Sequence, residues 1–539
     1  MSLSPTWRRA EAAVALTLSA LVVVLSLRFS MHAGPLWRDE VTTVNLANEP
    51  TYADLLSRLH LDSAPVLYPT VVRAWSGLGW GDEDAAMRVL GFLLAGGAVP
   101  VLWLAARGLG PPVPLVSMAL LGTNPTVLRT LGSVRPYGLG AVLVVLAFAA
   151  IARLTWSSRI GVFLLAAAAS ILAVQTLYQN AALILAMCVA GALACAAARD
   201  WKASARVLAV GAAAALSLLP YTNVLIRSQD WRPLNYSDVT TGWVLTRLAV
   251  TLSVSSTVLL ATWVLALGGA LDGAVRLLRA SPLGPQAPAE RRCALYAVLT
   301  LVCATAAQVT LHKLSGRFPH LWHFVPLMGV LALCLETLLF RRPRFPWARL
   351  AVAVTAVLVV LPASIAQGGV RQTNVDLIAR QLERSARAGD LIVVSPWYIG
   401  ITFARYHRDE VPWVTLPPIE DHTIHRYDLV KQRMLSPNPL APLYAAIGEA
   451  LRSGHRVWLV GSFRFLPPGQ VPAALPHPGG TTGWSDDFYH AAWSMHSGYF
   501  VQTHAVRWAT VPIATEQPVN DLENLPPPLM VEGWQPRPR

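Results

Sequence analysis

The sequence predicts a polytopic α-helical membrane protein with a C-terminal α/β domain outside the membrane. The 539 residues are 54% hydrophobic and only 14% charged, with a mean hydropathy of +0.46. That composition is too apolar for a soluble globular protein of this length. Apolar runs long enough to cross ~30 Å of hydrocarbon recur through residues 1–369, whereas residues 370–539 contain none.

Cysteine usage and charge exclude several other classes of protein. All five cysteines lie inside apolar runs and form no CxxC motif, so we interpret them as small buried hydrophobes rather than as disulfides or metal ligands. The net charge of +13 is spread over many short loops. Membrane lipids are therefore the expected partner of the basic residues, and nucleic acid is not.

The first apolar run, residues 10–27, follows Trp7-Arg8-Arg9 and has no small-residue cleavage site close behind it. It is expected to be a retained span with a cytoplasmic N-terminus. The loop that follows, residues 28–85, carries charges of both signs and two semi-apolar pieces, at 52–60 and 65–80. We interpret the second piece as a helix at the membrane interface that does not cross.

The distribution of basic residues decides that interpretation. If residues 65–80 do not cross, the basic clusters from Arg107 to Arg349 all lie on the same side as Arg8 and Arg9, as the positive-inside rule requires. The C-terminus is then external, and the chain has eleven spans. The predicted spans are 10–27, 86–106, 113–130, 136–153, 159–177, 180–198, 204–225, 244–271, 293–312, 321–340 and 347–366.

The external domain is expected to alternate helices and strands. Residues 374–388 and 440–452 have the spacing of amphipathic helices, and 390–394 and 456–460 are short buried strands. This alternation is typical of a small α/β domain. From about residue 524 the proline-rich sequence predicts a poorly ordered tail.

The stretch Trp37-Arg38-Asp39-Glu40 stands out because two adjacent carboxylates at a membrane edge carry a large desolvation cost unless they have partners or a function. With the predicted topology, other polar residues share its external face. Arginines beside a carboxylate pair suit phosphate chemistry, since cations hold the anion and a carboxylate accepts a proton. The additional candidates are Asp62, Tyr68, Arg88, Arg135, Tyr137, Lys313, Arg317 and His323.

Structural roles remain open for these residues. Arg38 and Asp39 can form a simple loop ion pair, Glu40 can cap the next helix, and Arg135-Pro136-Tyr137 can mark only a helix start. His422 and His425 have no third ligand at recognisable spacing, so no metal site is predicted. Phosphate-loop, GxSxG and HExxH motifs are absent from the sequence.

Five motifs in order resemble the GT-C superfamily of membrane glycosyltransferases, specifically the branch of protein O-mannosyltransferases and lipid A aminoarabinose transferases. Asp39-Glu40 is similar to the Asp-Glu of the family's first external loop, and residues 62–68 (DSAPVLY) to its Pro-Pro-Leu-Tyr-Tyr stretch. Residues 86–90 (AMRVL), 135–137 (RPY) and 316–318 (GRF) resemble three later motifs. Val66 and Phe318 depart from the family's proline and tyrosine.

The resemblance implies a GT-C-like fold and an inverting transfer of a sugar from a polyprenyl-phosphate donor to an acceptor hydroxyl. Asp39 would be the general base, and Glu40 would position the acceptor or support Asp39. Arg88, Arg135 and Arg317 would hold the donor phosphate. Substrate contacts are expected from Arg38, Asp62, Tyr68, Tyr137, Lys313 and His323.

The acceptor would be a cell-envelope glycan, lipid or protein, and the composition is typical of a bacterial plasma-membrane protein. No cofactor is required by the sequence, although a divalent metal at Asp39 and Glu40 is an open alternative. The main alternative function is a lipid-linked sugar flippase or another secondary transporter. A transporter is expected to place its ionisable residues at mid-membrane rather than at one face. A non-catalytic scaffold is a third alternative.

Overall fold

The chain folds into two compact units in the computed structural model. The described residues are 5–80, 83–231, 234, 236–279, 287–341, 347–475 and 485–536. The first unit, called the helical unit below, comprises residues 1–32, 63–223 and 237–369. The second, called the sheet unit, comprises residues 33–62, 224–236 and 370–539. Residues 33–62 of the predicted first loop therefore fold with the C-terminal residues.

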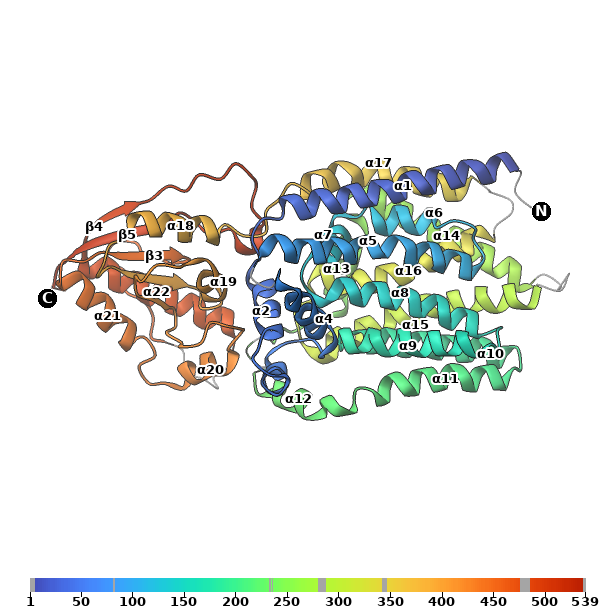
Figure 1. The fold of residues 1–539 in the computed structure, drawn as a ribbon, viewed down its shortest axis with the longest axis horizontal. Coiled ribbons are helices and arrows are strands. Elements are labelled where there is room, and N and C mark those ends of the chain that lie inside the picture. The colour runs from blue at the N-terminus through green and yellow to red at the C-terminus, as the bar shows by residue number, and fades with distance from the viewer. Residues whose placement is uncertain are drawn as a thin grey trace. The chain divides into compact units, whose positions relative to one another are not determined.

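The helical unit is a bundle of apolar helices (Figure 1). Its packed interior is one large cluster of buried apolar side chains drawn from most of these helices. Its principal helices are α1 (Pro5–His32), α4 (Leu67–Trp75), α5 (Asp84–Leu109), α6 (Leu115–Ser117), α7 (Pro125–Gly132), α8 (Pro136–Leu154), α9 (Ile160–Thr176), α10 (Asn180–Ala197), α11 (Trp201–Leu216), α13 (Thr241–Ser253), α14 (Thr257–Arg279), α15 (Ala287–Ser315), α16 (Val325–Phe340) and α17 (Ala348–Gln367). Helix α12 (Thr222–Arg227) contributes residues to both units.

Within the described residues, nine helices are long and apolar enough to cross a membrane, against the eleven spans predicted. Helix α9 is apolar but shorter, with 17 residues. The predicted span 113–130 is broken, because the Asn124 side chain accepts hydrogen bonds from Thr126 N (2.9 Å) and Val127 N (3.3 Å) and Pro125 begins α7. The predicted span 244–271 is divided between α13 and α14.

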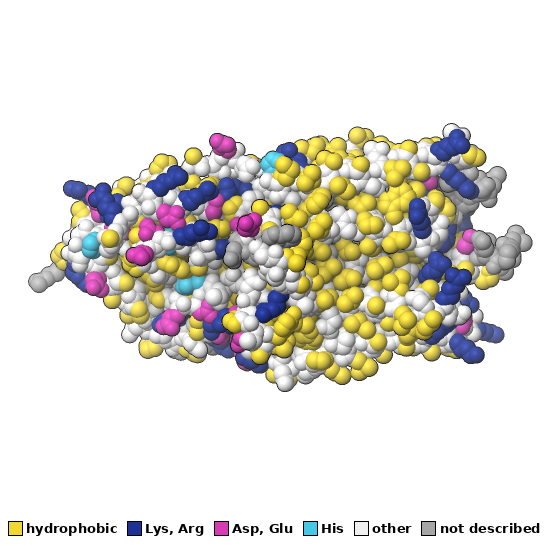
Figure 2. Space-filling model, viewed as in Figure 1, with side chains coloured by type: hydrophobic (Ala, Val, Ile, Leu, Met, Phe, Trp, Pro, Cys, Tyr) yellow, Lys and Arg dark blue, Asp and Glu magenta, His cyan; other side chains and the backbone are white. Residues whose placement is uncertain are grey.

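The surface of the helical unit is that of a multi-pass membrane protein. Figure 2 shows a largely hydrophobic face, with Lys and Arg side chains gathered at the end of the bundle that carries the N-terminus. Many large apolar side chains are exposed, including Leu265 (75%) and Leu358 (69%). Exposure of so many apolar side chains is favourable only when they face lipid. Basic residues also lie in the last turns of helices of this unit, such as Arg107 in α5 and Arg153 in α8.

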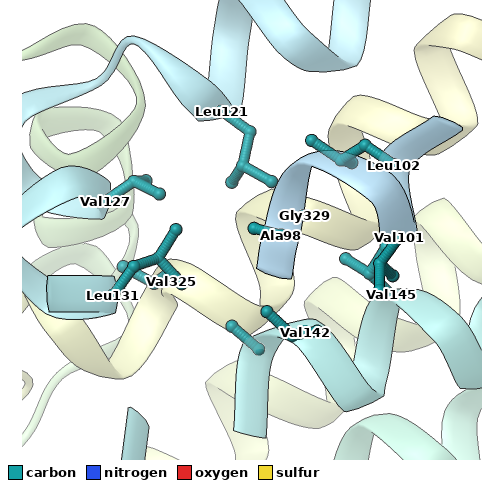
Figure 3. Close-up of a pocket in the computed structure, with 11 residues that line it drawn as sticks. Ala98, Val101, Leu102, Leu121, Val127, Leu131, Val142, Val145, Val325 and Gly329 are labelled. Atoms are coloured by element: carbon teal, nitrogen blue, oxygen red, sulfur yellow. The ribbon is translucent and has the colours of Figure 1, made fainter. Parts of the chain in front are cut away.

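Close helix packing inside the bundle depends on glycines. A Cβ atom at Gly91 of α5 would lie 2.1 Å from the carbonyl oxygen of Gly132 in α7, and one at Gly329 of α16 would lie 2.9 Å from Val145 of α8. Gly329 and Val145 also line a small apolar pocket, into which Figure 3 shows side chains from α5, α7 and α8 projecting. The wall of this pocket is entirely apolar, so we assign it to core packing.

A buried ion network ties three helices of the helical unit together. Arg349 of α17 donates to both carboxylate oxygens of Glu11 in α1 (2.9 and 2.8 Å) and to Oε1 of Glu336 in α16 (2.6 Å from Nη2). The three side chains are 3%, 1% and 0% exposed, respectively. Glu336 also accepts from Ser117 N at 2.8 Å, so the network extends to α6. Arg349 was expected to belong to a basic cytoplasmic cluster, and Glu11 had no predicted role.

The sheet unit contains a five-stranded sheet in the order β2-β1-β3-β5-β4. Strands β1, β2 and β3 are parallel, while β5 is antiparallel to both β3 and β4. Helices α18 and α19 bury one face of β1 and β3, and α21 packs against the same strands and β5. The strands are β1 (Leu391–Ser395), β2 (Trp413–Thr415), β3 (Val457–Gly461), β4 (Ala505–Thr510) and β5 (Leu529–Trp534). The helices are α2 (Arg38–Ala47), α3 (Tyr52–Arg58), α18 (Val375–Ser385), α19 (Ile399–Tyr406), α20 (Tyr427–Leu435), α21 (Ala441–Arg452) and α22 (Asp486–His504).

The structure confirms the α/β character predicted for the C-terminal residues and adds strands that the sequence did not indicate. The two predicted helices correspond to α18 and α21, and the two predicted strands to β1 and β3. The proline-rich segment differs from the poorly ordered tail that was expected, because residues 529–534 form β5 between β3 and β4. Hydrogen bonding on both sides orders a segment whose own composition favours disorder.

Candidate catalytic site

The stretch Trp37-Arg38-Asp39-Glu40 forms the start of helix α2 in the sheet unit. Trp37 precedes the helix, and its backbone N–H donates to Oε2 of Glu40 at 3.3 Å. Glu40 is 0% exposed, so its carboxylate caps the helix from which it projects. Asp39 remains about one-fifth exposed at the same helix start. The two adjacent carboxylates therefore have different environments, with Glu40 inside the fold and Asp39 at its surface.

Arg38 is anchored by residues of the C-terminal segment. Its backbone N–H donates to Oε2 of Glu523 at 3.3 Å, and its guanidinium carbon lies 4.2 Å from the centre of the Tyr398 ring. Its Nε lies 3.4 Å from Oδ1 of Asp39. A cation over an aromatic face and beside a carboxylate is stabilised by both. Arg38 thus holds one oxygen of Asp39 in place.

Two buried carboxyl groups support this anchor. Burial raises the pKa of Glu523 to about 7, although Arg38 and the hydrogen bond from the Thr402 hydroxyl (2.8 Å) act in the opposite direction. Burial likewise raises the pKa of Asp486 to about 7, against the hydrogen bond that it accepts from Trp397 Nε1 at 3.3 Å. Both groups are therefore part protonated near neutral pH.

A histidine from the C-terminal segment also contacts Asp39. Nε2 of His425 lies 3.7 Å from Oδ1 of Asp39, and Nδ1 of His425 lies 3.1 Å from the hydroxyl oxygen of Thr42 in the same helix. The His425 ring is stacked on Tyr427 at 5.7 Å, and Tyr427 is stacked on Trp231 at 4.8 Å. Nothing local in the sequence connects His425 with Asp39, and with His422 it had been weighed only as a candidate metal ligand.

The sheet unit also has an open polar cleft of ≈ 670 Å³ lined by Asn45, Arg58 and the segment Glu420–Thr423, among other residues. Its charged groups largely satisfy one another: Arg58 contacts Glu49 at 3.1 Å and Asp421 at 3.5 Å. We therefore describe it as a solvated ion network.

Asp62, another predicted substrate residue, ends a short 3-10 turn in this unit, where its backbone N–H donates to Leu59 O at 3.1 Å.

In the helical unit, several predicted residues gather around His323. The Tyr137 hydroxyl lies 3.5 Å from Nε2 of His323, and the guanidiniums of Arg135 and Arg317 are near enough to act on that ring electrostatically. Arg135 is the residue before α8 and is only 7% exposed. Nδ1 of His323 is buried without a hydrogen-bond partner among the described residues. An unsatisfied buried atom of this kind is a group that a ligand can pair with.

Aromatic and polar neighbours that the sequence did not single out complete this cluster. His320 is stacked on Trp322 with ring centres 4.2 Å apart, and His312 is stacked on His323 at 5.6 Å. Gln308 Nε2 lies 3.1 Å from His312 and donates to the His323 carbonyl at 3.3 Å. His312, His320 and His323 lie close together in the sequence, but no local pattern indicates that Gln308 contacts them.

The remaining predicted residues of the helical unit have distinct environments. Arg88 is 4% exposed in the first turns of α5, one turn before the close approach of Gly91 to α7. Tyr68 is fully buried in α4. Lys313 is exposed in the last turn of α15. Within the described residues, no group of three or more His, Cys, Asp or Glu side chains is arranged to hold a metal ion.

The fold is similar to that of two crystal structures of ArnT from Cupriavidus metallidurans. The structure bound to undecaprenyl phosphate matches with a TM-score of 0.51 and 15% sequence identity, covering 85% of this chain and 94% of that chain. The apo structure matches with a TM-score of 0.51 and 15% identity, covering 85% and 93%. No protein-family model and no curated protein matches the chain. The likeness shows that the chain shares the fold of ArnT, in line with the family resemblance of the sequence.

Proposed function

We propose that this protein is a membrane glycosyltransferase that uses a polyprenyl-phosphate-linked sugar donor. The fold shared with ArnT over 85% of the chain is the observation that carries the proposal, together with the undecaprenyl phosphate bound in one of those structures. A lipid-linked donor also suits a protein that presents a broad apolar surface. The N-terminus would be cytoplasmic and the sheet unit extracytoplasmic, in a bacterial plasma membrane.

In this proposal Asp39 is the general base. An acceptor hydroxyl attacks the anomeric carbon from the side opposite the phosphate, Asp39 accepts the hydroxyl proton, and the polyprenyl phosphate leaves with the electrons of the broken C–O bond. The sugar is transferred with inversion. Partial exposure favours Asp39 for this role over Glu40, which caps its own helix and would support Asp39 indirectly.

The arginines would bind the donor phosphate and stabilise its charge as it leaves. Arg135 and Arg317 support this role because both act on the ring of His323, whose Nδ1 is buried without a described partner. Arg88 is proposed to bind the phosphate with them because its motif, residues 86–90, resembles that of the family. Removal of one such contact is expected to cost about 3 kcal/mol of transition-state stabilisation. Asp62, Tyr68, Tyr137, Lys313 and His323 remain proposed substrate contacts, and Arg38 is proposed to orient Asp39.

Replacement of Asp39 by asparagine tests the proposal. Asn keeps the shape of the side chain and cannot accept the proton, so transfer from a radiolabelled undecaprenyl-phosphate sugar is expected to fall about 10²- to 10⁴-fold. The matched control is Asp409→Asn, an exposed aspartate of the sheet unit, which should transfer normally. Full activity in Asp39→Asn at normal expression would exclude Asp39 as the base.

The same assay separates the alternatives. A lipid-linked sugar flippase or other transporter would move the labelled lipid across the membrane without separating sugar from phosphate. An enzyme releases polyprenyl phosphate and labels an acceptor. A non-catalytic scaffold does neither, and the chemical class of the labelled product would identify the acceptor as glycan, lipid or protein.

A further inference from the structure

We propose that His425 is a positioning residue for Asp39. The inference rests on the proposed function, because it assigns His425 a role only if Asp39 is the base. Its basis is the contact of His425 Nε2 with Asp39 Oδ1 at 3.7 Å and of His425 Nδ1 with the Thr42 hydroxyl at 3.1 Å. Asp39 and Thr42 are three residues apart in α2 and so lie on one helix face. The imidazole contacts both residues and so holds the start of α2 in place.

The surroundings of His425 keep its ring in one orientation. Tyr427 is stacked on it with an interplanar angle of 13°, and Trp397 meets it edge-on at 6.0 Å and 87°. Tyr427 is in turn stacked on Trp231 with an interplanar angle of 14°. Trp231 is itself fixed by a 2.6 Å hydrogen bond from its Nε1 to the His60 carbonyl. A ring held on this many sides presents Nε2 to Asp39 in a constant direction.

The Thr42 contact allows the ring proton of His425 to lie on Nε2. When the Thr42 hydroxyl donates to Nδ1, the ring proton sits on Nε2 and points toward Oδ1 of Asp39. Arg38 Nε approaches the same oxygen at 3.4 Å. The guanidinium and the imidazole thus both contact this one oxygen, and together they restrict the orientation of the carboxylate. A neutral imidazole adds this orientation without adding a full positive charge, which would weaken the base.

Positioning of this kind predicts a loss in the chemical step rather than in substrate binding. A base displaced by a fraction of an ångström lowers the rate while the donor still binds, because proximity and orientation govern the transition state. We therefore expect His425→Phe, which retains the stack on Tyr427 but cannot donate, to lower kcat about 10- to 100-fold with little change in KM. His425→Gln, whose amide nitrogen can replace Nε2, should recover part of that loss.

The experiment uses the full chain in membranes, with radiolabelled undecaprenyl-phosphate mannose and undecaprenyl-phosphate aminoarabinose as probes and release of undecaprenyl phosphate as the readout. His422→Phe is the matched control, because this neighbour packs on Trp413 (ring centres 4.5 Å apart). The pH profile of kcat should change shape in His425→Phe and stay unchanged in His422→Phe, because only the first removes an ionisable neighbour of the base.

The outcomes separate this inference from the proposed function. If Asp39→Asn is inactive but His425→Phe has a normal kcat and pH profile, positioning by His425 is wrong and the proposed function stands. If Asp39→Asn is fully active, the proposed base fails and the role of His425 fails with it. If neither probe is a donor, thermal unfolding of Asp39→Asn, His425→Phe and the double variant decides. Non-additive shifts support the pair, and additive shifts overturn it.

Discussion

Arg349 is the single residue whose loss should most destabilise the helical unit. It donates to Glu11, to Glu336 and to the carbonyl of Val113 (3.0 Å), and it is 3% exposed. Replacement by methionine keeps the volume of the side-chain stem but leaves two carboxyl groups buried without their cation. Breaking one buried ion pair costs about 3–5 kcal/mol, so Arg349→Met should cost at least that much.

The assay is unfolding of the detergent-solubilised protein, followed by tryptophan fluorescence. Arg9→Met, an exposed arginine of α1, is the matched control and should change stability by about 0.5 kcal/mol or less. The variant Arg349→Met/Glu11→Met/Glu336→Gln should regain most of the loss, because apolar replacements of a buried ion network are often near neutral. Glutamine is chosen at Glu336 because its carbonyl can still accept from Ser117 N.

Two results would refute this reasoning about the network. A single variant as stable as Arg9→Met would mean that the carboxyl groups find other partners. A triple variant no more stable than Arg349→Met would mean that shape, rather than uncompensated charge, dominates the loss.

Two further predictions concern the other unit and the helix packing. The pKa of Glu523, raised from 4.5 to about 7, makes the folded state bind more protons than the unfolded state in that window. The Glu523 contribution to stability should therefore fall by on the order of 3 kcal/mol as pH rises from 4.5 through 7. Glu523→Gln should remove this contribution and so reduce the pH dependence of the thermal unfolding midpoint between pH 5 and 8, while the contribution of Asp486, whose pKa is also raised to about 7, remains. Gly91→Ala should lose about 1–3 kcal/mol, because its Cβ would lie 2.1 Å from a backbone oxygen of α7. Gly96→Ala, with open space around the new Cβ, should be neutral or stabilising, and equal stability of the two variants would contradict the packing argument.

The sequence revealed those features that are encoded locally. Hydropathy located most of the helices of the bundle, and residue periodicity located α18, β1, α21 and β3 to within one to three residues. Strand β5 was missed because it directly follows Pro526-Pro527-Pro528 in a proline-rich segment, whereas its order comes from pairing with β3 and β4. The break at Asn124 was visible as an Asn-Pro pair, which is a helix-start signal inside an apolar run.

The candidate site likewise has a part that could be predicted from local sequence and a part that could not. The desolvation cost of Arg38, Asp39 and Glu40 could be inferred from adjacent letters of the sequence. The groups that contact them, including Glu523 and His425, come from distant parts of the chain and have no local signal. Glu11 was overlooked for the same reason, because a single carboxylate at the start of an apolar run gives no sign of a partner in α17.

The division of the chain bears on why the proposed enzyme has a C-terminal domain. Residues 33–62 carry Asp39 and fold with residues 370–539 rather than with the bundle. The Tyr406 hydroxyl bonds to both the N–H (2.7 Å) and the carbonyl (3.1 Å) of Leu36, and Gln372 N donates to Ala33 O at 2.8 Å. The segment that leads into the proposed base is thus held by C-terminal residues. In the proposed mechanism, the C-terminal residues form the support on which the orientation of Asp39 depends.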